Sequence, residues 1–190
     1  MSDTTAPQTP DLADLIVHLA RLGQSTTSTR LTAAQWTALR YFARARRPSR
    51  TPSAFSCFHA TTRGTASQTV KSLVAMGLLA RESHGTDGRS TLLDVTEAGH
   101  AMLRMDPLED LRRVLARLDP DQRAAMGAAL RQSVGEMAQL REVPVFGSCV
   151  DCIHCDRGPQ GVICRKSQNK LDAEEMASFC VEFRPVSLRQ

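Results

Sequence analysis

The sequence predicts a mainly α-helical protein with one small β-hairpin and a short metal-bound module at its C-terminal end. Apolar residues recur at helical spacing along most of residues 11–142, two strand-like segments flank a turn-rich stretch, and five of the six cysteines fall between Cys149 and Cys180. With 190 residues, 42% hydrophobic and 23% charged, the chain has room for one domain of ordinary size plus an appendage. We therefore expect a disordered tail over residues 1–10, a main domain over 11–143 and a cysteine-rich extension over 144–190.

The start of the chain lacks the signals of export. Residues 1–10 carry two prolines and three threonines, with no basic segment followed by an apolar one. No run approaches 18 apolar residues, so a transmembrane helix is not expected. Without an export signal, clustered cysteines favour metal binding over disulfides, and the expected location is cytoplasmic.

Two helices are predicted first. The spacing of apolar residues indicates a helix from Asp11 to about Gly23, with a stripe formed by Leu12, Leu15, Ile16, Leu19 and Leu22. A second helix follows Thr32, which forms a capping box with Gln35, and it stops before Pro48. Its buried face is expected to be Trp36, Leu39 and Phe42.

A short helix over residues 53–60 and another over 65–76 come next. Gly77 is well placed to end the second one in the left-handed conformation. Residues 78–82 and 90–95 are predicted strands, because His84-Gly85 and Asp87-Gly88 between them are typical turn residues.

Two long helices complete the main domain. Thr96 caps one that runs to residue 118, with a kink or short break at Pro107, and Asp119-Pro120 opens a last helix that Pro144 closes. The apolar stripes over 97–118 and 120–142 are too extended for a small domain to cover. A partner subunit is the simplest cover, so a homodimer is expected.

This order of elements is that of a winged helix-turn-helix, and five segments carry a more specific resemblance. They are Leu31–Trp36, Ser67–Leu73, Met76–Leu79, the wing tip Asp87–Arg89 and Leu92–Gly99. In this order they resemble the MarR (multiple antibiotic resistance regulator) family over residues 32–103. The resemblance implies a transcriptional regulator, usually a repressor. It also implies a symmetric dimer held by the N-terminal and last two helices, which places the fourth helix in successive major grooves of a pseudo-palindromic operator.

The chain departs from the family's usual pattern in one place. Residues 53–62 include Phe55, Cys57, Phe58 and His59. This departure puts the docking angle of the recognition helix in doubt. Cys57 itself is interpreted as a small buried hydrophobic residue, with a redox-active thiol as the alternative.

The distribution of charge agrees with a polyanionic partner. Residues 30–89 hold ten basic and two acidic residues, a local charge of +8, whereas the whole chain carries +4. Double-stranded DNA is the expected partner, because neutralised phosphates release counterions. The alternative is a solvated basic face.

Five residues of the recognition helix are candidate DNA contacts. Gln68 has the amide that pairs with adenine, and Ser67 can bond a base edge or a phosphate. Arg63 and Lys71 are expected to contact phosphates, and Thr65 lies near the same N-terminal end. A solvated helix face is the alternative for each.

At the wing, Arg89 is expected to enter the minor groove, where narrow A·T tracts concentrate negative potential. Asp87 would hold its guanidinium in place. The alternative is a surface ion pair that stabilises the turn.

The tail carries a candidate metal site. Its cysteines are Cys149, Cys152, Cys155, Cys164 and Cys180, five candidates for a cage of four sulfurs. Either Cys152, Cys155, Cys164 and Cys180 bind, or Cys149 replaces one of the pair. His154 is a substitute ligand or a surface imidazole. A short helix over 171–179, capped by Asp172, would return Cys180 to the site.

The spacing C-x-x-C-x-x-C favours an iron–sulfur cluster. Zinc is the alternative, and redox-switched disulfides are a third interpretation. Apolar neighbours that could shield the group are Val145, Phe146, Ile153, Val162, Ile163 and Phe183.

These observations together predict a regulator rather than an enzyme, since no nucleophile–base pair, phosphate loop or carboxylate pair stands out. The predicted site senses iron, oxygen or redox state, and would act through the dimerisation helix that the tail continues. One alternative is a regulator that responds to a small aromatic ligand and has a structural zinc site. Another is an iron–sulfur electron carrier with a vestigial DNA-binding module.

Overall fold

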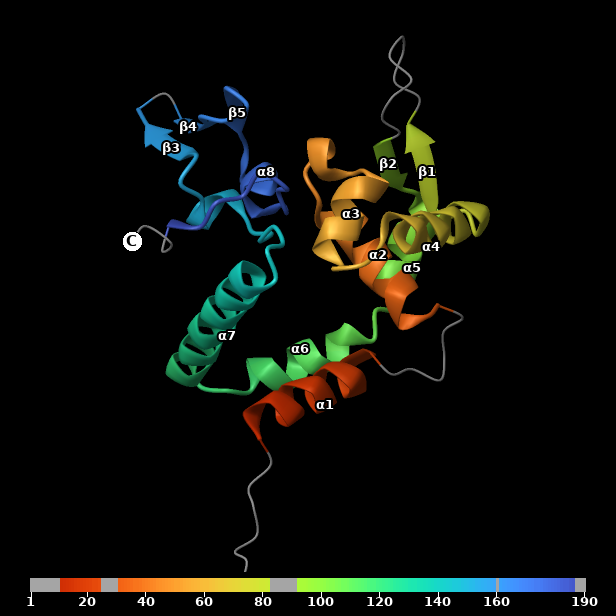
Figure 1. The fold of residues 1–190 in the computed structure, drawn as a ribbon, viewed down its shortest axis with the longest axis horizontal. Coiled ribbons are helices and arrows are strands. Elements are labelled where there is room, and N and C mark those ends of the chain that lie inside the picture. Colours follow the sequence, from red (N-terminus) through yellow and green to blue (C-terminus); the bar gives the residue numbers. More distant parts are fainter. Residues whose placement is uncertain (1–10, 25–30, 83–91, 160, 187–190) are drawn as a thin grey trace, which may run out of the picture.

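The computed structural model describes residues 11–24, 31–82, 92–159 and 161–186 (Figure 1). It is mainly helical, with a two-stranded and a three-stranded antiparallel sheet. The winged-helix lobe comprises α2 (Ala33–Arg44), η1 (Arg47–Ser49), α3 (Pro52–Phe58), α4 (Arg63–Ala75), β1 (Leu79–Glu82), β2 (Leu92–Val95) and α5 (Glu97–Leu103).

Side-chain caps fix where the helices of this lobe begin. Thr32 and Gln35 form the predicted capping box of α2. Thr62 caps α4, so that Arg63 is the first helical residue rather than part of the preceding turn. Gly77 follows α4 with φ of +70°, which confirms its predicted role as the left-handed terminator.

The hairpin pairs Leu79 with Val95 and Glu82 with Leu92. Strand β1 begins one residue later than predicted. Residues 83–91, which include the turn and the start of the second predicted strand, lie outside the described residues. The predicted wing contacts Asp87 and Arg89 lie there too.

The core of the lobe is apolar and aromatic. Trp36, Leu39, Phe42, Phe55 and Leu73 are fully buried, which confirms the predicted face of α2. Gly99 at the start of α5 allows that helix to approach the hairpin, because a Cβ there would lie 2.3 Å from the Leu78 carbonyl oxygen.

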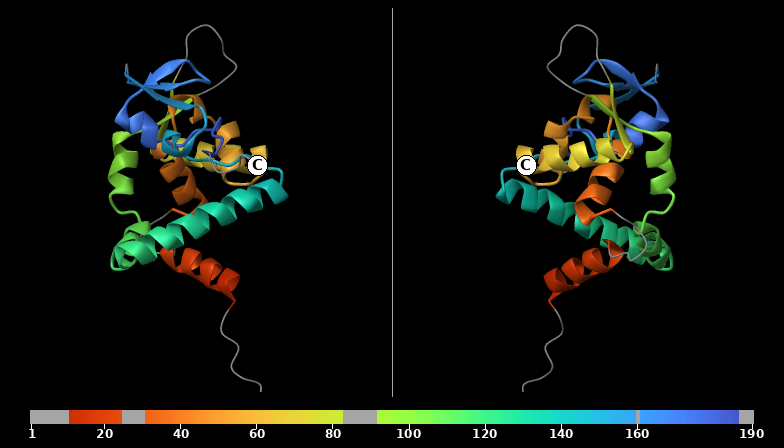
Figure 2. Two further views of the ribbon diagram at one scale, coloured as in Figure 1. Left: turned by 90° about the vertical axis from the view of Figure 1, so that its left-hand side faces the viewer. Right: turned by 90° about the vertical axis from the view of Figure 1, so that its right-hand side faces the viewer.

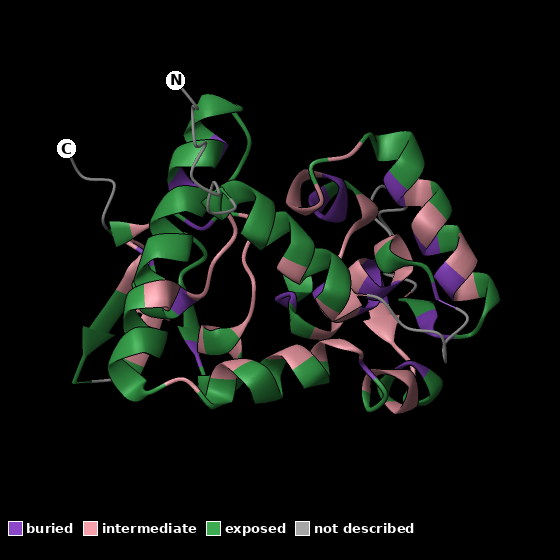
Figure 3. Cartoon of the chain, turned by 90° about the horizontal axis from the view of Figure 1, so that it is seen from below, coloured by how far each residue is buried: buried purple, intermediate pink, exposed green. Residues whose placement is uncertain are grey.

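Three helices extend away from this core: α1 (Leu12–Gln24), α6 (Leu108–Ala116) and α7 (Pro120–Leu140). The predicted helix over 97–118 is broken into α5 and α6 at Pro107, as the proline suggested. Figures 1 and 2 show α1 beside α6, where Gly23 lies against Leu108 and Leu111. Neither α1 nor α6 has a buried residue, and Figure 3 shows the long helices mostly exposed.

After α7 the chain forms a cysteine module. Its elements are η2 (Cys149–Asp151), β3 (Cys155–Gly158), β4 (Gly161–Cys164), β5 (Asn169–Leu171) and α8 (Ala173–Ala177). Helix α8 and its Asp172 cap were predicted, but the β3-β4-β5 sheet was not.

Among the residues that the structure describes, no helix combines the length and the hydropathy needed to cross a membrane.

Candidate functional site

Helix α4 presents a polar face to solvent. Arg63, Thr65, Gln68 and Lys71 are exposed and Ser67 is half-buried, whereas Ala66, Val70 and Leu73 form the inner face. The sequence therefore placed this face correctly. Thr65 differs from the others because its hydroxyl already has a partner within the protein. It lies 2.9 Å from the hydroxyl of Thr62, the residue that caps α4.

Most basic residues that precede this helix are already paired. Arg40 contacts Asp106 at 2.6 Å, Arg47 contacts Glu82 at 2.6 Å, and Arg50 contacts Asp94 at 2.6 Å. The local charge of +8 thus overstated the number of cations available to a polyanion. Two of the acidic partners, Asp94 and Asp106, lie outside residues 30–89 and were not counted with them.

The basic residues of α4 and β1 differ from these. Within the described ranges, no acidic side chain lies within ion-pair distance of Arg63, Lys71 or Arg81. Lys71 and Arg81 line the same small depression beside Ser67. Uncompensated cations beside hydrogen-bonding side chains are the composition that phosphate and base-edge contacts require. Arg81 was not predicted as a site residue, because no motif marks it.

The second candidate site is a cluster of four cysteines. Cys149, Cys152 and Cys164 are buried and Cys180 is half-buried. The 3₁₀ turn η2 holds Cys149 and Cys152 together, β4 ends at Cys164, and a bridge between Gly147 and Cys180 brings the last thiol in. Cys155 pairs with Cys164 across β3 and β4 and also packs against the cluster.

A buried arginine reaches this cluster from the winged-helix lobe. The Arg46 side chain is 5% exposed, and its Nη1 lies 3.9 Å from Cys149 Sγ. Its Nη2 lies 3.6 Å from the Glu175 carboxylate, and its Nε has no hydrogen-bond partner within the described part of the chain. Arg46 was missed from the sequence, because it stands among Arg44, Arg47 and Arg50 in a segment that reads as solvated.

The thiols and the arginine act on one another electrostatically. Burial raises the pKa of Cys149 to about 11, with Arg46 opposing and the neighbouring thiols adding to the increase. Burial also raises the pKa of Cys180. Burial opposes ionisation of Cys164 too, but hydrogen bonds from Ser167, Lys166 and Arg46 lower its pKa overall. Although burial lowers the pKa of Arg46, Cys149 and Cys180 raise it overall, so this residue is a permanent buried cation.

The donor set suits a thiolate-bound metal group. In the described part of the chain no three His, Cys, Asp or Glu side chains stand at coordinating positions. Four clustered sulfurs are nevertheless ligands that zinc and iron–sulfur groups prefer. Arg46 is a buried cation whose Nε has no hydrogen-bond partner in the described chain, so it would stabilise a group with net negative charge on these sulfurs. The residues therefore fit such a group by their chemistry.

The apolar neighbours divide between two environments. Phe183 is buried, and its ring lies against Gly147, where a Cβ would come within 2.6 Å. Val162 packs against the cysteines, as predicted. Phe146 instead packs on Tyr41 and Phe58 of the winged-helix core.

Cys57 is half-buried on α3, so it is less enclosed than the predicted core residue.

Comparison with known proteins agrees with this architecture. Residues 31–90 match the MarR family. No curated protein matches the chain.

Several solved structures share the fold. A MepR–DNA complex from S. aureus has 18% identity and a TM-score of 0.53, with 66% of this chain and 95% of that chain covered. A MarR transcriptional regulator from Methanosarcina mazei Go1 has 18% identity and a TM-score of 0.55, covering 67% and 96%. A MarR family protein from Bacillus stearothermophilus has 20% identity and a TM-score of 0.51, covering 67% and 90%. Residues 31–90 thus match the MarR family, and the chain shares the fold of MarR-type transcriptional regulators.

Proposed function

We propose that this chain is a homodimeric, sequence-specific DNA-binding repressor whose cysteine site binds an iron–sulfur cluster and senses iron, oxygen or redox state. One observation carries the DNA-binding part. On a MarR-type fold, the polar face of α4 presents Gln68 with Arg63 and Lys71, two cations that no acidic residue of the described chain pairs. The MepR structure from S. aureus is itself a complex with DNA.

In this proposal α4 lies in the major groove. Its width admits a helix, and each base pair presents a distinct pattern of donors and acceptors there. Gln68 reads a base edge, while Arg63 and Lys71 contact phosphates and fix the register. Arg89 of the wing, outside the described residues, contacts the minor groove and Asp87 orients it.

A second copy of the chain covers the apolar stripes of the outer helices. Exposed residues of α1 and α7 include Leu12, Leu15, Val134, Met137 and Leu140, and Leu140 is 79% exposed. Contiguous exposure of this kind marks an interaction surface. A twofold pair then places two copies of α4 for a pseudo-palindromic site.

DNA binding is tested by titrating the operator region at matched salt. Gln68→Ala and Arg89→Ala are each expected to weaken specific binding by about 1–3 kcal/mol, the cost of one specific contact. Fluorescence anisotropy with labelled duplex gives the affinities. Arg47→Ala is the matched control, because Arg47 is engaged with Glu82. A monomer that binds no duplex even at low ionic strength contradicts the proposal.

The residues that would hold the cluster are Cys149, Cys152, Cys164 and Cys180. Arg46 interacts with Cys149, Cys164 and Cys180, and Cys152 interacts with Cys149 and Cys180. When bound, an iron–sulfur group supplies a redox-active, oxygen-sensitive centre. The protein's own contribution is to enclose it. Cys149 and Cys152 are held by one turn, Cys164 by a strand end, and Phe183 and Val162 exclude water.

Anaerobic purification followed by metal analysis and a visible spectrum tests this part. Iron with sulfide and a broad visible absorption is the expected result, and colourless zinc-loaded protein contradicts the sensor proposal. Cys149→Ser is expected to abolish incorporation, whereas Cys155→Ser is expected to retain it. Equal affinity of metal-free and loaded protein for DNA would make the metal structural.

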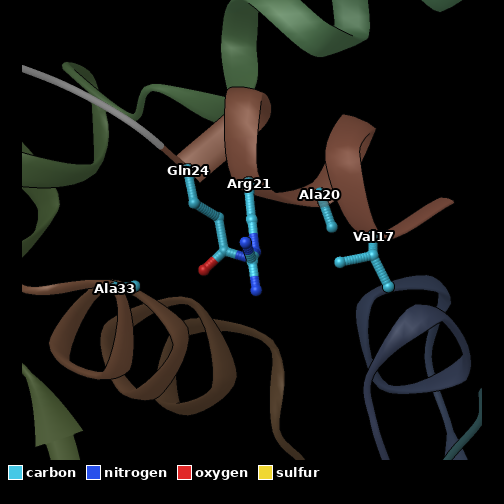
Figure 4. Close-up of a pocket in the computed structure, with 5 residues that line it drawn as sticks. All are labelled: Val17, Ala20, Arg21, Gln24 and Ala33. Carbon is cyan, nitrogen blue, oxygen red and sulfur yellow. The ribbon is translucent and has the colours of Figure 1, made fainter. Parts of the chain in front are cut away.

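One observation favours a second candidate function, a regulator that responds to a small aromatic ligand and has a structural zinc site. An open groove of about 400 Å³ lies between α1 and α2. Figure 4 shows the residues that line it, Val17, Ala20, Arg21, Gln24 and Ala33. Loss of DNA binding on adding salicylate-like ligands to metal-loaded protein would favour this candidate.

A further inference from the structure

We propose that Arg46 is a positioning residue that couples the cysteine site to the DNA-reading helices of the same chain. The inference rests on the proposed function, since it requires a metal group on the cysteines. The sequence predicts that the metal site affects DNA binding through the dimerisation helix. The proposed coupling is shorter, because the module contacts the winged-helix lobe directly.

The backbone on either side of Arg46 is tied to the end of the module. Ala45 forms a parallel bridge with Phe179. The Arg46 amide donates to the Phe179 carbonyl at 2.8 Å, and the Phe179 amide donates to the Arg44 carbonyl at 2.7 Å. The Val181 amide donates to Ser49 Oγ at 3.0 Å. We call these contacts between residues 44–49 and 179–181 the docking seam.

The seam points the Arg46 guanidinium into the thiol cluster. Its polar surroundings there are sparse: Glu175 lies at 3.6 Å, Cys149 Sγ lies at 3.9 Å, and Nε has no hydrogen-bond partner in the described chain. A buried cation is costly unless it is paired and hydrogen-bonded. Four thiolates outweigh the charge of a divalent metal ion, so a loaded site is net negative and provides the missing partner.

The same segment leads straight into the helix-turn-helix. The Tyr41 hydroxyl donates to the Ser49 carbonyl at 2.7 Å, and Thr51 caps α3. The Phe179 ring packs against Phe58 of α3, with 5.4 Å between the ring centroids. Helix α3 in turn packs on α4. A change in how firmly Arg46 is held therefore reaches the element that sets the position of the DNA-reading helix.

The experiment uses the full chain with Zn²⁺ alone as the probe, because thiolates bind zinc whether or not the resident group contains iron. Arg46→Met removes the charge and keeps the length, Arg46→Lys keeps the charge, and Arg47→Gln is the control on an exposed neighbour that pairs with Glu82. Zinc affinity is measured by chelator competition, thermal unfolding with and without zinc, and amide hydrogen exchange over residues 44–51.

We expect Arg46→Met to bind zinc about 10- to 100-fold more weakly, as for other residues that support metal ligands. We also expect the metal-free variant to unfold at no lower temperature than wild type, because the charge of Arg46 stabilises the fold only when the site is loaded. The zinc-dependent protection of residues 44–51 should disappear in Arg46→Met and persist in Arg46→Lys and Arg47→Gln.

The outcomes separate the two proposals. Wild type that binds neither zinc nor iron contradicts the metal site and this inference with it. Wild type that binds zinc, together with an Arg46→Met variant of equal affinity and equal protection, overturns the role of Arg46 alone. If Arg46→Met does not fold, an Arg46→Lys variant that binds zinc more than tenfold more weakly than wild type also overturns the charge argument.

Discussion

The winged-helix lobe and the cysteine module are stabilised in different ways. The lobe buries large aromatic and aliphatic side chains, including Trp36, Phe42 and Leu73, and exposes almost nothing of them. In the module the buried side chains are mainly those of cysteines, with Leu171 and Phe183 beside them. A region this small gains little from apolar burial alone, so we expect its order to depend on the proposed metal group and on the docking seam.

The two regions are also joined to the rest of the chain by different contacts. A buried ion pair between Arg40 and Asp106 fastens the lobe to the start of α6. Asp106 also accepts a hydrogen bond from the Leu108 amide, so that one carboxylate both pairs with Arg40 and binds the first residue of α6. The module instead uses backbone hydrogen bonds at the docking seam. An ion pair thus attaches the lobe to the start of α6, and main-chain hydrogen bonds attach the lobe to the module that follows α7.

If the proposed metal group is present, the largest difference between the regions is expected on its removal. Chelation should unfold the module, with a loss on the order of 10 kcal/mol, as for structural thiolate sites. The lobe should keep its structure, because its core contains no cysteine that belongs to the cluster. Hydrogen exchange of β3–β5 amides against those of α2 and α4 measures this. Equal protection of β3–β5 before and after chelation would show that the module is held without metal.

A matched pair of substitutions compares the two cores directly. Leu73→Ala, at a fully buried position of α4, is expected to cost about 4 kcal/mol of unfolding free energy. Leu171→Ala, which is 7% exposed in the module, is expected to cost about 2 kcal/mol, and only in the module's own transition. Urea unfolding followed by circular dichroism and by metal release separates the transitions. Equal losses in one shared transition would mean that the regions unfold as a unit.

The buried carboxylate of Asp106 gives a smaller effect than Leu73 and adds a pH dependence. Although burial opposes ionisation, the hydrogen bonds of Arg40 and the Leu108 amide hold the pKa of Asp106 below its ordinary value of 3.8. Because the folded pKa is depressed, its contribution is complete above pH 3.8 and is lost as the pH falls through the folded pKa.

Asp106→Asn should therefore cost about 3 kcal/mol at neutral pH, since it leaves Arg40 buried without its partner. The difference from wild type should shrink at low pH. Thermal unfolding between acid and neutral pH measures it, with Asp110→Asn as the control at a residue whose side chain is 87% exposed. A constant difference at all pH values would contradict the assignment.

Local signals predicted the helices well. Capping residues Thr32, Thr96, Asp119 and Asp172 each begin a helix as expected, because a cap is determined by its neighbours in the sequence. The exposed face of α4 was also predicted, since helical periodicity decides it.

Long-range features escaped sequence reasoning. The β3-β4-β5 sheet has strands of three or four residues with mixed exposure, too short for an alternating pattern to stand out. Arg46 and Asp106 look like ordinary surface charges, and only tertiary contacts over 103 and 66 residues reveal their burial. The choice among five cysteines likewise depends on which thiols the fold brings close to one another.

The docking seam also sets an order of assembly. It joins residues 44–49 to residues 179–181, so more than a hundred residues must be synthesised after the first half of the contact before the second half exists. The helix-turn-helix, whose contacts are close in sequence, is complete on the ribosome long before that. Newly made molecules therefore pass through a stage in which the DNA-reading part is finished and its sulfur-bearing attachment is still missing.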